Sequence, residues 1–190
     1  MKYKLAIILL VCCVLVGCSD MKQPVAETNT YVIPNSFFEF THVEVADEVS
    51  SCLALGRDYC TDAREVPEGM ELVLTAEQLN NFVQRNNTFV DELVEKFLKA
   101  DSLYRCELDG EYQTLSLYFD ENISTGLQVE TMLGIASHYG INYMLTNDTT
   151  EWNVFLSIYN CHTNKLVVSV NIPEEKVSYG AQEWEDSYIE

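Results

Sequence analysis

The stretch TAEQLNNFVQRNNTFVDELVEKFLKA, residues Thr75–Ala100, decides the architecture around which the rest of the chain is arranged. Its apolar residues recur with a period of about 3.6, which is typical of an amphipathic helix. Thr75 and Gln78 fit a capping box, in which the two side chains satisfy free backbone N–H groups of the first turn. The stretch therefore predicts a long helix with a buried apolar stripe, made of Leu79, Phe82, Val83, Val90, Leu93, Val94, Phe97 and Leu98.

The polar positions of this helix carry two further predictions. Asn86 and Asn87 interrupt the apolar stripe and indicate a kink. The polar face is acidic rather than basic, whereas helices that bind a membrane surface are rich in lysine and arginine. Packing against a protein core is therefore favoured.

Strands are predicted on both sides of the helix. Met70–Leu74 is a short apolar run that precedes it. Ser102–Leu108 and Gln113–Phe119 follow it and flank Asp109-Gly110, a pair that is typical of a hairpin turn between apolar runs. This half of the chain thus predicts one strand, one helix and one hairpin.

A second helix is predicted from Thr125, because Thr125 and Gln128 repeat the capping-box pattern and Gly140 suits the position just after a helix end. Three strands follow, at Ile141–Thr146, Trp152–Cys161 and Leu166–Ile172. The predicted fold class is α+β, with an antiparallel or mixed sheet and two main helices packed on one of its faces.

The remaining segments have weaker patterns. Aromatic and β-branched residues predict a strand at Phe37–Val45, apolar spacing predicts a helix at Ala46–Leu55, and Arg57–Gly69 has the acidic composition of a loop. The expected organisation is a signal peptide at 1–17, a lipidated tether at 18–35, a single globular domain at 36–172 and an acidic mobile tail at 173–190.

The amino-terminal apolar run, Leu5–Val16, follows two lysines and is shorter than the roughly 20 residues that a membrane span needs. It ends in Leu15-Val16-Gly17-Cys18, which resembles the bacterial lipobox. This resemblance implies cleavage before Cys18 and acylation of that cysteine with diacylglycerol and a further chain such as palmitate. The alternative is an uncut apolar anchor in which the cysteines are incidental.

The lipobox resemblance also implies a location. Ser19 follows the cysteine, whereas an aspartate in that position retains lipoproteins of enteric-type bacteria in the inner membrane. We therefore expect a lipid-anchored, periplasm-facing protein of the outer membrane, with the inner membrane or the cell surface as alternatives. Several acyl chains are enough for stable anchoring in a bilayer.

A second resemblance covers at most Met70–Ile172. The order of helix, Gly140–Thr146, Val154–Asn160, polar turn and Lys165–Val168 is similar to the closing half of the TolB amino-terminal-like domain. That domain occurs in curli-secretion lipoproteins and in lipoprotein activators of penicillin-binding proteins. Asn142 stands where those families have an aspartate. The resemblance implies a non-catalytic adaptor in the cell envelope.

The charge of the chain excludes one class of partner. The formal net charge is −19, and removal of Lys2 and Lys4 with the signal peptide lowers it to −21. Nucleic-acid binding requires lysine and arginine to neutralise phosphates, so no nucleic-acid partner is expected. Attachment to anionic lipid by charge is disfavoured for the same reason.

Four cysteines follow Cys18, namely Cys52, Cys60, Cys106 and Cys161. An exported protein meets an oxidising compartment, so disulfides are expected, and pairing Cys52 with Cys60 and Cys106 with Cys161 is the simplest arrangement. A metal site that includes a histidine is the alternative. No C-x-x-C or H-x-x-x-H spacing appears, so neither a metal nor another cofactor is predicted.

No catalytic constellation stands out. The chain has no G-x-S-x-G motif, P-loop or Rossmann glycine pattern. Cys161 and His162 are adjacent, and adjacent residues on a strand point to opposite faces, which argues against a nucleophilic pair. His138 near a helix end suits a surface residue better than a base. We therefore predict that the protein is not an enzyme.

The predicted function is an adaptor or accessory subunit that binds another periplasmic or outer-membrane protein. Along Trp152–Cys161, Phe155 and Tyr159 alternate with aliphatic residues, so helices on the aliphatic face leave them, with Trp152 nearby, as a candidate interface. Cover by segment 37–69 is the competing possibility. The alternative function is a lipoprotein that binds a small ligand or a glycan through the same aromatic residues.

The lipid anchor leads to the first testable prediction. Cys18→Ala should abolish labelling of the chain with radioactive palmitate in intact cells, because the acylated thiol is lost, and it should leave the chain uncleaved or soluble. Cys13→Ala is the matched control and should label normally. Unchanged labelling of Cys18→Ala would refute the lipoprotein assignment.

Overall fold

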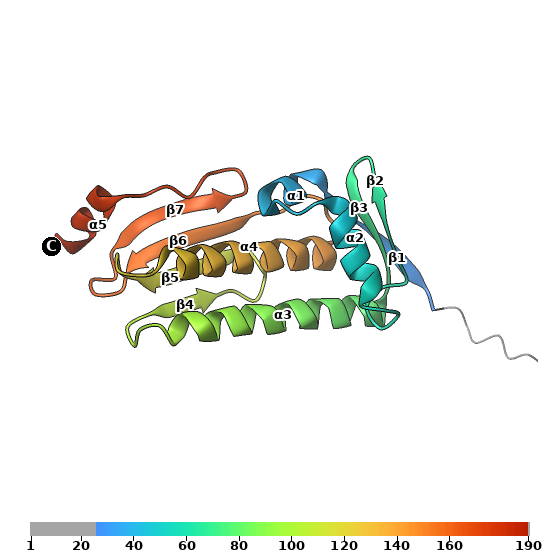
Figure 1. Ribbon diagram of the computed structural model, residues 1–190, viewed down its shortest axis with the longest axis horizontal. Helices are drawn as coiled ribbons and strands as arrows, with labels where there is room; N and C mark the ends of the chain where they lie inside the picture. The colour runs from blue at the N-terminus through green and yellow to red at the C-terminus, as the bar shows by residue number, and fades with distance from the viewer. Residues whose placement is uncertain (1–25, 190) are drawn as a thin grey trace, which may run out of the picture.

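Two long helices form the centre of the structure, which a computed structural model describes for residues 26–189. α3 (Ala76–Leu98) and α4 (Thr125–Asn147) lie side by side and run in opposite directions (Figure 1). The predicted signal peptide and the predicted lipidation site, Cys18, lie outside the described residues.

α3 begins with the predicted capping box and continues without a break. The hydroxyl of Thr75 accepts a hydrogen bond from the Gln78 backbone N–H at 3.2 Å, and the Gln78 side chain accepts one from the Thr75 N–H at 2.8 Å. The kink predicted at Asn86 and Asn87 does not interrupt α3, which is one helix across both residues. Asn86 is buried and donates to Oδ1 of Asn142 on α4 at 2.9 Å, so the asparagine joins the two helices.

A four-stranded mixed sheet packs against the two helices. Its order is β4 (Arg105–Leu108), β5 (Thr114–Phe119), β6 (Val154–Asn160) and β7 (Leu166–Ile172). β4–β5 and β6–β7 are antiparallel hairpins, whereas β5 and β6 are parallel and connected through α4. The predicted α+β fold with two main helices on one sheet face is confirmed.

A second, three-stranded antiparallel sheet lies at one end of the helices (Figure 1). Its order is β1 (Thr28–Pro34), β3 (Gly69–Thr75) and β2 (Asp62–Val66). β1 falls within the predicted tether and β2 within the predicted acidic loop, so those two predictions are wrong for these residues. β1 belongs to the fold because Tyr31 and Ile33 alternate with more exposed residues and are buried.

The segment between β1 and β2 is helical. α1 (Asn35–Thr41) replaces the strand predicted at Phe37–Val45, and α2 (Val45–Ala54) matches the predicted helix. Phe37 and Phe38 are adjacent and both buried, which a strand with one covered face does not allow. Packing of both rings therefore favours the helix.

α4 continues through the strand predicted at Ile141–Thr146 and ends at Asn147. Ile141, Met144 and Leu145 are buried at helical spacing, so tertiary packing overrides the preference of this stretch for a strand. Gly140 is therefore inside the helix and does not end it. The N-cap of the helix is Ser124, one residue before the predicted cap Thr125.

The acidic tail is part of the fold. α5 (Ala181–Tyr188) brings Trp184, which is only 7% exposed, to 5.6 Å from the Phe119 ring. The amide of Asn160 donates to the Ser187 hydroxyl at 2.8 Å in a buried contact. The folded region thus extends from β1 to α5, beyond the predicted limits of 36 and 172, and the mobile-tail prediction is wrong for α5.

Gly140 gives a second testable prediction. A Cβ at this position would lie 2.4 Å from Cε3 of Trp152, whereas a Cβ at Gly126, in the first turn of the same helix, meets nothing within 4 Å. Gly140→Ala should therefore destabilise the protein by about 1–3 kcal/mol through overpacking. Gly126→Ala should be neutral or stabilise it by up to about 1 kcal/mol.

Urea unfolding monitored by tryptophan fluorescence measures both free energies. The close approach of Trp152 would be disproved if both alanine variants were equally stabilised.

Candidate functional site

The four-stranded sheet is covered on one face only. Leu115, Leu117, Leu156 and Ile158 are fully buried on the face toward α3 and α4. Among residues 26–189, no element covers the opposite face as a second layer. All four strands carry exposed side chains there, namely Arg105, Glu107, Thr114, Phe155, Leu166 and Ser169. This uncovered face is the first candidate site.

Three neighbouring strands place Arg105, Tyr118 and Tyr159 side by side, and we call this row the aromatic ladder. The Arg105 guanidinium lies 4.1 Å from the centre of the Tyr118 ring. The Tyr118 and Tyr159 rings stack with their centroids 4.8 Å apart. Arg105 also donates to the side-chain oxygen of Asn164 in the β6–β7 turn. These contacts hold the ladder rigid against the sheet.

Two exposed apolar side chains stand on the same face of the sheet as the ladder. Phe155 is 44% exposed on β6, and Leu166 is 50% exposed beside Tyr159 at the start of β7. The alternation argument therefore placed Phe155 and Tyr159 on the correct face. An apolar and aromatic surface of this composition is suited to binding another protein.

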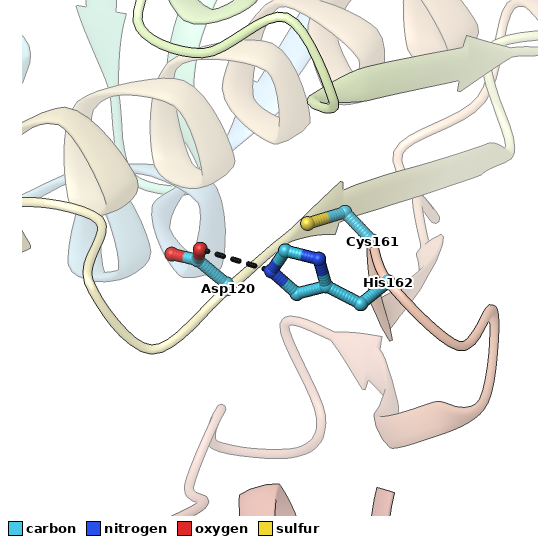
Figure 2. A group of neighbouring side chains, drawn as sticks. All are labelled: Asp120, Cys161 and His162. Carbon is cyan, nitrogen blue, oxygen red and sulfur yellow. Dashed lines mark hydrogen bonds and ion pairs between the residues drawn. The ribbon is translucent and has the colours of Figure 1, made fainter. Parts of the chain in front are cut away.

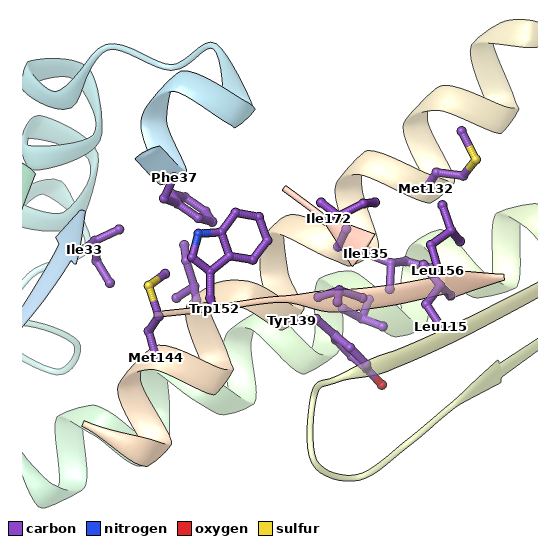
Figure 3. Packing of buried hydrophobic residues seen from close by; sticks show 14 of the residues in the cluster. Ile33, Phe37, Leu115, Met132, Ile135, Tyr139, Met144, Trp152, Leu156 and Ile172 are labelled. Carbon is purple, nitrogen blue, oxygen red and sulfur yellow. The ribbon is translucent and has the colours of Figure 1, made fainter. Parts of the chain in front are cut away.

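Trp152, the third predicted interface residue, is not part of this surface. It is 7% exposed and its ring lies 5.3 Å from those of Phe37 and Phe40 in α1 (Figure 3). Its position precedes β6, so the strand alternation does not apply to it. Segment 37–69 thus covers Trp152, as the competing possibility held, but leaves Phe155 exposed.

Among residues 26–189 the cysteines are free thiols, and neither predicted disulfide is formed. Cys106 on β4 and Cys161 after β6 are separated by β5, and strands two apart are about 9–10 Å from each other. A disulfide requires Cα atoms within roughly 7 Å, so this pairing is wrong. Burial raises the pKa of Cys52 and of Cys106 to about 12, which keeps both thiols protonated.

A second candidate site lies at the end of the sheet, where the side chains of Asp120, Cys161 and His162 converge (Figure 2). Nε2 of His162 lies 3.3 Å from Oδ2 of Asp120. Sequence reasoning dismissed Cys161 and His162 because neighbours on a strand point apart. β6 ends at Asn160, however, so both residues lie in a turn where that rule does not hold.

The electrostatics of this cluster are set by Asp120. Burial raises the pKa of Asp120, but hydrogen bonds from the Asn122 backbone N–H, the His162 ring and the Tyr104 hydroxyl lower it further than burial raises it. Burial and the nearby Asp120 carboxylate raise the pKa of the Cys161 thiol. The cluster therefore combines an ionised carboxylate with a protonated thiol at neutral pH.

A groove between α1 and α4 is a third candidate. It has a volume of about 320 Å³ and is lined mainly by apolar side chains: Phe37, Phe38, Phe40, Val43, Leu133 and Ile141. His138 also lines it, stacks on Phe89 with centroids 5.4 Å apart, and has a buried Nδ1 without a partner among the described residues. Burial lowers the pKa of His138, so the ring is neutral.

Comparison with protein-family models, with curated proteins and with solved structures finds no match to the chain. The TolB-like resemblance therefore stays a prediction. The strand that it implies at Ile141–Thr146 is helical, whereas β6 and β7 form the hairpin that it implies. Within residues 26–189 no helix is both long enough and apolar enough to cross a membrane.

The lowered pKa of Asp120 gives a testable pH dependence. Because its folded-state pKa lies below the unfolded value near 3.9, the carboxylate stabilises the fold above about pH 4, and this contribution is lost as the pH falls through the folded-state pKa. Asp120→Asn should therefore cost about 1–3 kcal/mol at pH 7, the value of hydrogen bonds to a charged group. The cost should be smaller at pH 3.

Urea unfolding in the presence of a chelator measures both values. Asp91→Asn, which changes an exposed carboxylate on α3, is the control and should cost little at either pH. An equal cost of Asp120→Asn at both pH values would contradict the assignment.

Proposed function

We propose that this protein is a cell-envelope lipoprotein, anchored through acylated Cys18, that acts as a non-catalytic adaptor by binding another periplasmic or outer-membrane protein. The observation that carries the proposal is the uncovered sheet face with its aromatic ladder and the exposed Phe155 and Leu166. Aromatic residues are enriched at protein interfaces relative to the rest of the protein surface.

The composition and rigidity of this face favour protein binding. Tyrosine and arginine are enriched among the residues that dominate binding energy at protein interfaces. The stacking of Tyr118 on Tyr159 and the guanidinium contact of Arg105 fix these side chains before a partner arrives. Little rotamer freedom is then lost on binding, which lowers the entropic cost of association.

The position of the fold relative to the anchor restricts where the partner lies. The first described strand starts at Thr28, ten positions after Cys18. A chain of that length spans at most about 36 Å. β1 is therefore held within about 36 Å of the acylated cysteine, which favours a partner in the same membrane or in the adjoining periplasm. The TolB-like resemblance supports an adaptor role by analogy only.

The groove between α1 and α4 favours the alternative function, a lipoprotein that binds a small ligand. Its volume lies within the range of about 300–1,000 Å³ that is usual for ligand sites. Its aromatic and aliphatic lining suits an apolar ligand better than a glycan, and the burial of Trp152 removes one of the proposed sugar-stacking platforms.

Replacement of Phe155 and Tyr159 by serine tests the adaptor proposal. A photo-crosslinking amino acid at the exposed Ser169 should capture an envelope protein in intact cells, and the double variant should lower this capture at least about tenfold. Loss of one aromatic anchor at the centre of an interface costs roughly 2 kcal/mol. The melting temperature should change by only a few degrees because Phe155 is exposed.

Two controls separate this proposal from its alternatives. A crosslinker at the exposed Glu92 on α3 should capture nothing in common with the one at Ser169. Leu133→Gln in the groove should leave capture unchanged if the sheet face binds the partner. Capture that is abolished by Leu133→Gln but kept in the Phe155→Ser and Tyr159→Ser double variant would move the functional site to the groove.

A further inference from the structure

The parallel pairing of β5 and β6 brings three potential metal ligands to the same end of the sheet. Asp120 directly follows β5, and Cys161 and His162 directly follow β6 (Figure 2). One ligand atom from each side chain lies within 4.8 Å of the other two. We propose that these three side chains form a binding site for a divalent transition metal of the zinc class.

The donor atoms select the class of metal. Thiolate sulfur and imidazole nitrogen are preferred by zinc and its neighbours, whereas Mg²⁺ and Ca²⁺ are bound through oxygen. Ligand atoms around a tetrahedral zinc lie about 3.3–3.8 Å apart, given bonds of about 2.0–2.3 Å. No two of the three ligand atoms are more than 4.8 Å apart, so an approach of about 1 Å at most brings them to this spacing. His162, whose side chain is 43% exposed, is free to turn by that amount.

The surroundings hold the ligands as second-shell groups do in metal sites. Oδ1 of Asp120 accepts hydrogen bonds from the Asn122 N–H at 2.9 Å and the Tyr104 hydroxyl at 3.2 Å. These bonds orient the carboxylate so that Oδ2 points toward His162.

The turn after β6 is held as firmly as the carboxylate. The Cys161 N–H donates to the Phe119 carbonyl at 2.9 Å, and the His162 N–H donates to Oδ1 of Asn160 at 2.9 Å. The backbone that carries the Cys161 and His162 side chains is therefore fixed by hydrogen bonds.

A nucleophilic cysteine is the competing reading of the same residues. A catalytic thiolate requires an electropositive environment, whereas Cys161 is buried next to Asp120 and close to Asp101. A bound cation would compensate these negative charges, and the Cys161 proton would be released to solvent as the metal–sulfur bond forms. Three protein ligands leave a fourth tetrahedral position for water or for a side chain of a partner.

Cobalt(II) titration of the full-length chain, purified in detergent under reducing conditions, tests the site. The wild-type protein should bind one Co²⁺ with a thiolate charge-transfer band and with visible bands typical of tetrahedral coordination, and Zn²⁺ should displace it. Cys161→Ser should lose the charge-transfer band, and Asp120→Asn and His162→Gln should weaken Zn²⁺ binding at least about tenfold. Cys106→Ser and His42→Gln are matched controls and should bind as the wild type does.

A second measurement does not depend on whether the variants fold. Zn²⁺ at about 100 times its dissociation constant should raise the melting temperature of the wild-type protein by about 5–10 °C, because the metal binds the folded state. A charge-transfer band that persists in Cys161→Ser, or a wild-type protein with neither the band nor the thermal shift, would overturn the proposal.

Discussion

The fold depends on the close packing of the Trp152 ring against the backbone of Gly140. An indole ring can lie on α4 at this point only because the helix has no Cβ there, and the same ring contacts Phe37 and Phe40 of α1. One side chain thereby joins the start of β6, the middle of α4 and the amino-terminal segment. Burial of an aromatic ring of 150–250 Å² contributes about 4–6 kcal/mol at 25 cal/mol per Å². That exceeds the cost of about 1–3 kcal/mol for Nε1, which has no hydrogen-bond partner among the described residues.

The same contact requires α4 to continue as a helix beyond Gly140, and this continuation sets the pairing of the two long helices. Asn142 lies two residues after Gly140 and contacts α3. Its side-chain amide accepts a hydrogen bond from Asn86 and donates one to Asn87. Buried amides that satisfy each other cost little when paired and much when separated, so they favour one register of α3 against α4. With both helices committed to one face of the sheet, the opposite face keeps Tyr118, Tyr159 and Phe155 at the surface.

Local signals in the sequence predicted the elements whose stability is local. The capping box at Thr75 and the Asp109-Gly110 turn are read from neighbouring residues, and both are present in the structure. The stretch Ile141–Thr146, predicted to be a strand, is helical because its side chains are buried through contacts with remote segments. β1 and α5 were missed for a related reason, because their apolar residues are few and gain their burial only from β3 and from the Phe119 region.

The same distinction between local and remote contacts explains which parts of the candidate sites could be predicted from the sequence. Strand alternation correctly separated Phe155 and Tyr159 from the aliphatic face, because that property belongs to one strand. It does not apply to Trp152 and was wrongly applied to the Cys161–His162 pair, because all three residues lie outside β6, where the side-chain period no longer holds. Asp120 joins the latter pair from a different part of the sequence, and only the parallel pairing of β5 with β6 brings it there. That pairing requires a crossover connection, which α4 supplies, so the helix seated under Trp152 also determines which residues meet at the end of the sheet.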